Sequence, residues 1–274
     1  MKWKMGGKRM KNIFIEGLQG TGKSTLTNRL SKELPQYHVY REGDTSPVEL
    51  AWCSYMTKEQ YEETLAKYPQ FVSDIESRTI FEENMRITAY TQILTDLPEF
   101  YQYMEGYEIY NGRVDYESFR KIIIKRYSNL NTTGNISECS LFQNAIESMM
   151  LFYQLSDEEI LQFYREVYKV LNQKQFILFY LSSNHVTEDI LQIKKERTDE
   201  NGNEIWFSLM MKYLESSPYG MEHQYSCLED LIKHLMRRKQ LECRIISEVF
   251  GQNAIILEAK QYEIEECLKH IAEF

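Results

Sequence analysis

The chain has 274 residues, 43% of them hydrophobic, and this length allows one substantial core. Its apolar runs are far shorter than the roughly 20 residues that a membrane-spanning helix needs, so no bilayer span is expected. The formal net charge of −9 repels a nucleic-acid backbone and argues against a duplex-binding role.

The amino-terminal part predicts a strand, a glycine-rich loop and a helix in succession. Residues 1–10 are basic but lack the apolar stretch of a signal peptide, so we expect a cytoplasmic protein. Residues 13–15 form a β-branched and aromatic run, and residues 23–34 carry leucines at a spacing of four, as helices do. Residues 37–40 then predict a second strand.

Capping patterns and the absence of helix breakers predict helices in the segment that follows. Residues 46–49 form a capping box with proline in the first turn, so a helix is expected to start at Pro47. Thr57 with Gln60 opens a further helix by the same logic. Residues 70–97 contain neither proline nor glycine and are expected to be mostly helical.

The middle of the chain is less regular. Residues 98–133 are rich in tyrosine and are interpreted as an insertion that contains a helix at residues 115–128. Residues 134–139 predict a short buried strand, and helices are expected at residues 141–155 and after Ser156.

The carboxyl-terminal part contains the clearest strand of the chain, at residues 175–181. Residues 186–197 and 204–215 are predicted helices on either side of a polar turn, and residues 194–204 are interpreted as a lid. The last strand and the closing helix are expected at residues 253–257 and 263–272.

Strands alternate with helices in this prediction, and no two strands follow each other directly. Such an order implies a parallel sheet covered on both faces. The fold class is therefore α/β, with three α/β/α layers, about five parallel strands and a helical lid. No repeat or flexible linker divides the sequence, so residues 1–274 are expected to form a single domain.

The segment between the first strand and the first helix fits the pattern G-x-x-x-x-G-K-[ST] without substitution. Its glycines let backbone N–H groups point at phosphate oxygens, Lys23 neutralises the β- and γ-phosphates, and Ser24 ligates Mg²⁺. ATP and Mg²⁺ are the predicted ligands of a P-loop NTPase fold, and a glycine turn that binds nothing is the alternative. The predicted nucleotide-binding residues are Gly17, Gln19, Gly20, Thr21, Gly22, Lys23, Ser24 and Thr25.

Glu42 is the first candidate for the group that accepts a proton from the phosphoryl acceptor. It follows the second strand, and the carboxyl ends of strands line the ligand crevice of open α/β sheets. The alternative is a solvated loop acid or a helix-capping anion, a description that fits Asp44 better than Glu42.

Three further residues follow the short third strand. Glu138 ends that strand and is a candidate to hold Mg²⁺ through water or to orient the acceptor, although a solvated turn residue is the alternative. Gln143 and Asn144 open the next helix and are candidate acceptor contacts, but a polar first turn is common.

Positive charge for the transferred phosphoryl group is expected from the basic run at residues 194–197, together with Arg41. A basic turn before a flexible polar loop would close over ATP and bring Arg197 to the moving phosphoryl group. A charged helix end that faces water is the alternative interpretation.

With these residues in view, the chain resembles the thymidylate kinase and deoxynucleoside kinase superfamily. Residues 14–25 are similar to its phosphate loop beyond the generic pattern, and residues 40–47 look like its second-strand motif. Residues 180–181 and 194–197 look like its fourth strand and lid. The resemblance implies a nucleoside or nucleotide acceptor and Glu42 as the base.

The chain departs from this family at two places. The acidic-Arg-Ser or Asp-Arg-Tyr signature after the third strand reads Glu138-Cys139-Ser140 here, so the arginine that would grip a nucleoside or its phosphate is missing. Residues 98–133 have no counterpart that we identify. Both departures concern the acceptor and leave the use of ATP intact.

Other chemistries find little support. The five cysteines are never spaced as C-x-x-C, and the histidines are far apart. We therefore expect an ATP-dependent kinase whose partner is a small-molecule phosphoryl acceptor, with neither nucleic acid nor membrane involved and homodimerisation left open. The alternative is a non-catalytic ATP-binding regulatory protein.

Overall fold

The computed structural model describes residues 10–171 and 175–273. The expectation about a signal peptide rests on residues 1–10, and nearly all of these lie outside the described residues. In the part that is described, no helix combines the length and the apolar character that crossing a bilayer would require.

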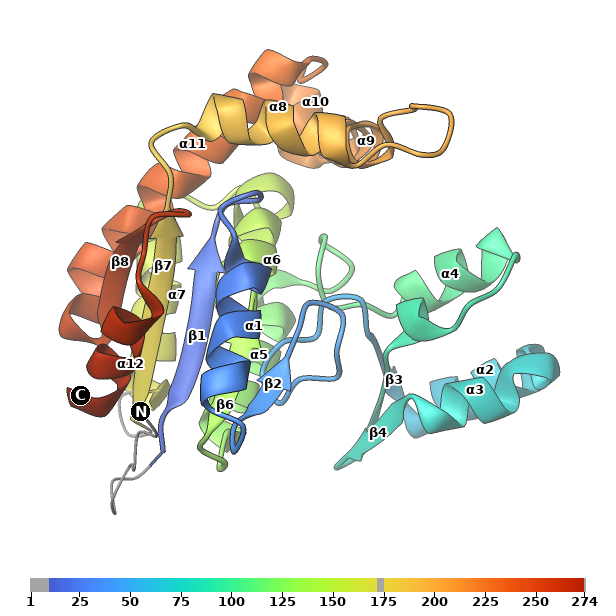
Figure 1. Cartoon of the computed structure of the whole chain (residues 1–274). Helices are drawn as coiled ribbons and strands as arrows, with labels where there is room; N and C mark the ends of the chain where they lie inside the picture. Colours follow the sequence, from blue (N-terminus) through green and yellow to red (C-terminus); the bar gives the residue numbers. More distant parts are fainter. Residues whose placement is uncertain (1–9, 172–174, 274) are drawn as a thin grey trace.

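A five-stranded parallel sheet forms the centre of the molecule, in the order β2-β6-β1-β7-β8 (Figure 1). The central strand pairs on both sides, so that Phe14 lies opposite Ser137 on one side and Leu178 on the other. The strands are β1 (Asn12–Gly17), β2 (His38–Tyr40), β6 (Asn135–Glu138), β7 (Phe176–Ser182) and β8 (Ala254–Glu258). All five match predicted strands.

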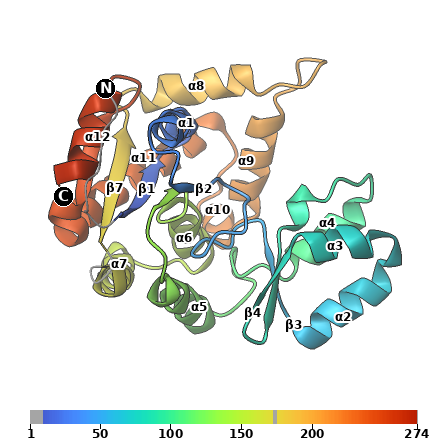
Figure 2. The same ribbon diagram turned by 60° about the horizontal axis from the view of Figure 1, so that its bottom comes forward.

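Helices cover both faces of this sheet, as predicted (Figures 1 and 2). Ile13 and Ile15 belong to the core cluster shared with one pair of helices, whereas Phe14 belongs to the cluster on the other face. This alternation follows from the two-residue period of a strand. The first face carries α1 (Lys23–Glu33) and α12 (Ile264–Glu273); the second carries α5 (Tyr116–Asn129), α6 (Gln143–Glu147), α7 (Asp157–Leu171) and the end of α11 (Leu228–Ile245).

A helical layer extends over the carboxyl end of the sheet (Figure 1). It consists of α8 (Val186–Glu196), α9 (Ile205–Ser216), α10 (Pro218–Glu222) and the start of α11. Leu18, in the loop after β1, packs in the same apolar cluster as Ile190, Ile193 and Leu214 of this layer. The lid helices are therefore in contact with the loop that follows β1. Movement of residues 194–204 stays a prediction.

A second sheet corrects the prediction that no two strands follow each other. It is antiparallel, with the order β3-β5-β4, and comprises β3 (Ser54–Thr57), β4 (Thr79–Glu82) and β5 (Met85–Thr88). Within residues 70–97, predicted to be mostly helical, the α-helical part is α3 (Val72–Ser77). The hairpin turn needs no glycine because Glu83 itself adopts a left-handed φ of 50°. The absence of glycine from residues 70–97 therefore did not indicate a helix.

The helix predicted to start at Pro47 is also absent. The Ser46 hydroxyl accepts from the amides of Val48 and Glu49, as a cap does, at 3.2 Å each. The next two amides, however, donate to the Glu49 carboxylate at 2.7 and 2.6 Å, and Arg126 donates to the carbonyls of Ser46 and Val48. Because these groups are already used, the helical ladder does not propagate.

Other local predictions are confirmed. Thr57 and Gln60 form the expected capping box of α2 (Lys58–Lys67), and α5 fills most of the predicted helix at residues 115–128. Within residues 98–133, α4 (Pro98–Glu105) packs with α2 and α3 through Phe100 and Met104, whereas α5 packs against α7. The description of residues 98–133 as an insertion stays a prediction.

Candidate active site

The loop between β1 and α1 has the tight geometry that its glycines allow. Gly17 has a φ of 143°, and a Cβ there would lie 2.5 Å from the carbonyl oxygen of Leu181 on β7. Gly20 has a φ of 80°, and a Cβ there would lie 2.7 Å from Ile193 of α8. The Thr21 hydroxyl donates to the Leu18 carbonyl at 2.8 Å and braces the turn. Larger residues would disrupt this loop.

Lys23 is the first residue of α1, and its side chain reaches back to the loop. Its ammonium group donates to the carbonyls of Gly17 and Leu18, at 2.8 Å each, so the side chain lies over the turn that it follows. The first turn of α1 contains no acidic residue, and Gly22 provides no side-chain cap. The positive end of α1 and the Lys23 ammonium therefore face the same place, which favours an anion.

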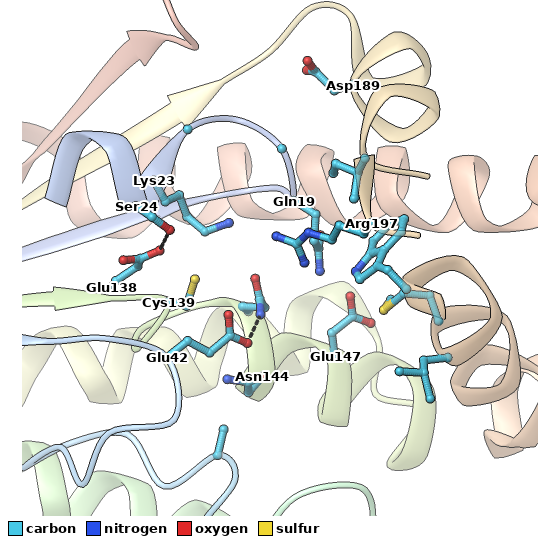
Figure 3. A pocket seen from close by; sticks show the side chains of 18 of the residues that line it. Gln19, Lys23, Ser24, Glu42, Glu138, Cys139, Asn144, Glu147, Asp189 and Arg197 are labelled. Carbon is cyan, nitrogen blue, oxygen red and sulfur yellow. Dashed lines mark hydrogen bonds between the residues drawn. The ribbon is translucent and has the colours of Figure 1, made fainter. Parts of the chain in front are cut away.

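Ser24 and Glu138 come together across the end of the sheet (Figure 3). The Ser24 hydroxyl donates to one carboxylate oxygen of Glu138, which is buried at the end of β6, and Arg41 lies 3.9 Å from the other oxygen. A hydroxyl and a carboxylate are the oxygen ligands that Mg²⁺ prefers. No group of three His, Cys, Asp or Glu residues in the described chain forms a metal site by itself. The pair thus fits a Mg²⁺ ion that also binds phosphate oxygens.

Glu42 and Gln143 also meet, although they are far apart in sequence. The Gln143 amide donates to the Glu42 carboxylate at 2.8 Å, and the Trp52 indole N–H lies 3.5 Å from the same oxygen. Asn144 follows on α6, and its side-chain amide nitrogen is buried without a hydrogen-bond partner among the described residues. Both hydrogen bonds therefore reach the same oxygen of Glu42, and neither uses its second oxygen.

The predicted lid arginine reaches the same region. Arg197 ends α8, and in Figure 3 its side chain extends toward Gln19 of the loop. Lys194 instead pairs with Glu204 at 3.2 Å and lies over the Phe207 ring, 4.4 Å from its centroid. Arg41 turns its guanidinium to Asn28, at 2.6 Å. Of these basic residues, Arg197 is the one that lines the cavity.

One cavity of about 990 Å³ joins these groups. Gly17 and Thr21 shape the loop behind it without lining it. The predicted site residues that line it are Gln19, Gly20, Gly22, Lys23, Ser24, Thr25, Glu42, Glu138, Gln143, Asn144 and Arg197. The structure therefore brings together residues from four segments. In the sequence, only their positions at the ends of predicted strands and helices related them.

A buried charge cluster beneath the loop was not predicted. Glu147 of α6 pairs with His234 at 2.6 Å and with Arg238 at 2.5 Å, and Arg238 also donates to the Gln19 side chain at 3.2 Å. Burial alone would raise the pKa of Glu147, but His234 and Arg238 lower it to about 2. His234, Arg238 and Glu242 recur every four residues on α11, and this polar stripe on an amphipathic helix was the available signal.

Glu16, directly before the loop, was missed as well. One of its oxygens accepts from the Leu141 amide at 2.6 Å, and the other is buried without a hydrogen-bond partner in the described structure. Burial raises the pKa of Glu16 to about 8, although the Leu141 amide and Lys23 act in the opposite direction. Burial therefore favours the protonated form of this carboxyl group behind the phosphate loop.

The wall beyond Glu42 contains further residues that the sequence did not indicate. Trp52 precedes β3, and Glu108 and Tyr110 precede α5. Helix α9 adds apolar and aromatic side chains to the same wall: Trp206, Leu209, Met210 and Tyr213. No sequence motif marks these residues, because they come from loops and from an apolar helix face. The same apolar pattern is expected of a helix that packs in the hydrophobic core.

Comparisons with known proteins give a limited result. No protein-family model and no curated protein match the chain. Among solved structures, the chain is similar to shikimate kinase from Bacteroides thetaiotaomicron, with a TM-score of 0.39 and 10% identity over 97% of this chain and 98% of the other. It is also similar to deoxyadenosine kinase from M. mycoides with bound dATP, with a TM-score of 0.36 and 17% identity over 96% and 97%.

These scores are too low to say anything about activity. The fold class instead rests on the chain's own structure: a five-stranded parallel α/β sheet whose central strand β1 leads through the glycine loop into α1, the context that a P-loop requires.

Proposed function

We propose that the chain is an ATP-dependent small-molecule kinase that transfers the γ-phosphoryl group to a hydroxyl or phosphate acceptor. Nucleosides and nucleotides are the leading acceptor class, because of the sequence resemblance noted above. One observation carries the proposal: a single cavity is lined both by phosphate-loop residues, among them Lys23 and Ser24, and by the Glu42–Gln143 pair. A candidate donor site and a candidate base for the acceptor thus share one cavity.

The residues divide into two groups of roles. The loop amides and Lys23 bind the β- and γ-phosphates, and Ser24 with Glu138 holds Mg²⁺, which neutralises phosphate charge when bound. On the acceptor side, Glu42 takes the proton of the attacking hydroxyl, while Gln143 keeps its carboxylate in place. Arg197 stabilises the charge on the group in transfer.

The test is a coupled assay of ADP release over nucleosides, nucleotides, sugars and aminoglycosides. We expect ADP release that depends on one acceptor class and is lost in Lys23→Ala, whose circular dichroism spectrum should match the wild type. Full turnover by Lys23→Ala would contradict the role of the loop.

A non-catalytic ATP-binding protein is the second candidate, because Cys139 stands where the related kinases carry an arginine. Cys139 also holds a left-handed φ of 57°, an unusual backbone conformation for a residue that lines the cavity. Tight ATP binding without ADP release over the whole panel would favour this candidate over the kinase.

A further inference from the structure

Positive charge in the cavity is confined to the phosphate-loop side. Lys23 and Arg29 belong to α1, Arg197 ends α8, and Lys260 follows β8. Lys260 is already paired with Asp189 at 2.6 Å. Among the described residues that line the cavity there is no other Lys, Arg or His. The basic side chains are therefore placed for a triphosphate and not for an anionic acceptor.

The wall beyond the phosphate loop carries carboxylates whose hydrogen-bond partners are uncharged. Glu42 accepts from the Gln143 amide at 2.8 Å. Glu108 is only 4% exposed and accepts from the Tyr90 hydroxyl at 2.6 Å. Burial raises the pKa of Glu108 to about 7, because the Tyr90 hydroxyl and the nearby Arg113 compensate only in part. The side chain thus lacks a full counter-ion.

The arginines near this wall are engaged elsewhere and do not line the cavity. Arg113 pairs with Glu105, and Arg126 pairs with Glu82 and donates to the Ser46 carbonyl at 2.6 Å. Glu147 also lines the cavity, and its charge is matched by Arg238 beneath it. On this side of the cavity, none of the described lining residues is therefore an unpaired cation that could receive a phosphate.

We propose that the phosphoryl acceptor is a hydroxyl compound that carries no phosphate or carboxylate group and is either uncharged or positively charged. This proposal rests on the kinase function proposed above and chooses between the two acceptor types left open there. An anionic group in this wall would face the Glu42 carboxylate without a counter-ion among the described lining residues, and it would add negative charge beside the buried Glu108. A hydroxyl or ammonium group would instead donate to their oxygens.

The reaction balances with such an acceptor. The acceptor oxygen forms a bond to the γ-phosphorus, and the bond from that phosphorus to the β–γ bridging oxygen breaks, so that ADP leaves. The hydroxyl proton passes to the Glu42 carboxylate. Neither an oxidant nor a further reactant is needed.

The same wall indicates that the acceptor has a flat or apolar body. Trp52 is 45% exposed and Leu209 is 62% exposed, and both line the cavity together with Trp206 and Met210. When a ligand covers large apolar side chains that are exposed in a cavity, the burial of their surface contributes favourably to the free energy of binding. A hydroxyl compound with an aromatic or hydrocarbon body would cover them, whereas a small sugar phosphate would not.

The charge of the acceptor can be tested before its identity is known. A small-molecule extract is separated on an anion exchanger into retained and unretained fractions, and each is added to the protein with Mg·ATP, with Lys23→Ala as the blank. We expect ADP release with the unretained fraction. Release with the retained fraction alone would overturn the proposal, whereas ATP binding without release in either fraction would contradict the kinase function itself.

Glu108 is the residue that this inference adds to the acceptor site. In Glu108→Gln, which preserves shape, we expect the amount of unretained fraction needed for half-maximal rate to rise at least fivefold, with the KM for ATP unchanged. Glu105→Gln is the matched control, since Glu105 lies three residues away, pairs with Arg113 and does not line the cavity. Equal half-maximal amounts in both variants would remove Glu108 from the acceptor site.

Discussion

Glu42 illustrates what a single residue contributes to this site. Its carboxylate accepts a hydrogen bond from Gln143 and lines the cavity opened by the phosphate loop. In Glu42→Gln we expect kcat to fall by about a hundredfold or more, the usual contribution of a general base, with ATP affinity unchanged. Glu83→Gln is the control, because Glu83 is an exposed acid in the turn between β4 and β5 that pairs with Lys125 of α5. Normal turnover by Glu42→Gln would remove it as the base.

Glu16 makes stability depend on pH. Burial raises its pKa from the ordinary 4.5 to about 8, so the folded protein keeps a proton that the unfolded chain has released between these values. The resulting stabilisation is complete below pH 4.5 and is lost as the pH rises through about 8.

We therefore expect the free energy of unfolding in urea to fall between pH 5.5 and pH 8.5, more steeply in the wild type than in Glu16→Gln. Glu49 and Glu108, whose pKa values burial raises to about 7, act in the same direction in both proteins. Equal slopes for the two proteins would show that Glu16 is ionised in the fold.

Residues differ in how well the sequence predicted them. Ser24 and Glu42 were found because a motif or a strand end marked them, and the structure places them at one cavity. Glu147 and Arg238 were missed because each reads as one polar residue on an amphipathic helix, and their pairing at 2.5 Å joins positions 91 residues apart. Sequence spacing carries no information about such contacts.

At the scale of elements, the strands of the main sheet and the helices beside them were predictable because their periodicity is strong. The hairpin within residues 70–97 was not predictable, because its strands are short and it turns at Glu83 instead of at a glycine. The helix prediction for the segment after Ser46 failed for a different reason. Its capping signal is real, but Glu49 and Arg126 take the backbone groups that a helix would need.

The contact between α8 and the phosphate loop gives a test at this scale. Gly20→Ala puts a methyl group against Ile193 and forces a left-handed alanine, so we expect ATP affinity to fall about tenfold or more. Gly202→Ala is the matched control, because Gly202 has the same φ of 80° and open space around it. Binding titrations that show equal ATP affinity in the two variants would contradict the close packing of lid and loop.

The whole molecule combines a predictable core with a less predictable cavity wall. Net charge, sheet class and the phosphate loop could be inferred from the sequence, since they depend on composition and on local patterns. The second sheet and the wall built from residues 52, 108 and α9 depend on how distant segments pack. Of these wall residues, Glu108 belongs to residues 98–133, for which we identified no counterpart in the family that the sequence resembles.

The central claim is that the loop of residues 17–24 forms a binding site for the triphosphate of ATP. Calorimetric titration with Mg²⁺ and a non-hydrolysable ATP analogue tests it most directly, in the wild type and in Lys23→Ala. We expect saturable binding at one site in the wild type and affinity lowered about tenfold or more, or roughly 1.4 kcal/mol, in the variant. No binding by the wild type, or unchanged affinity in Lys23→Ala, would contradict the claim.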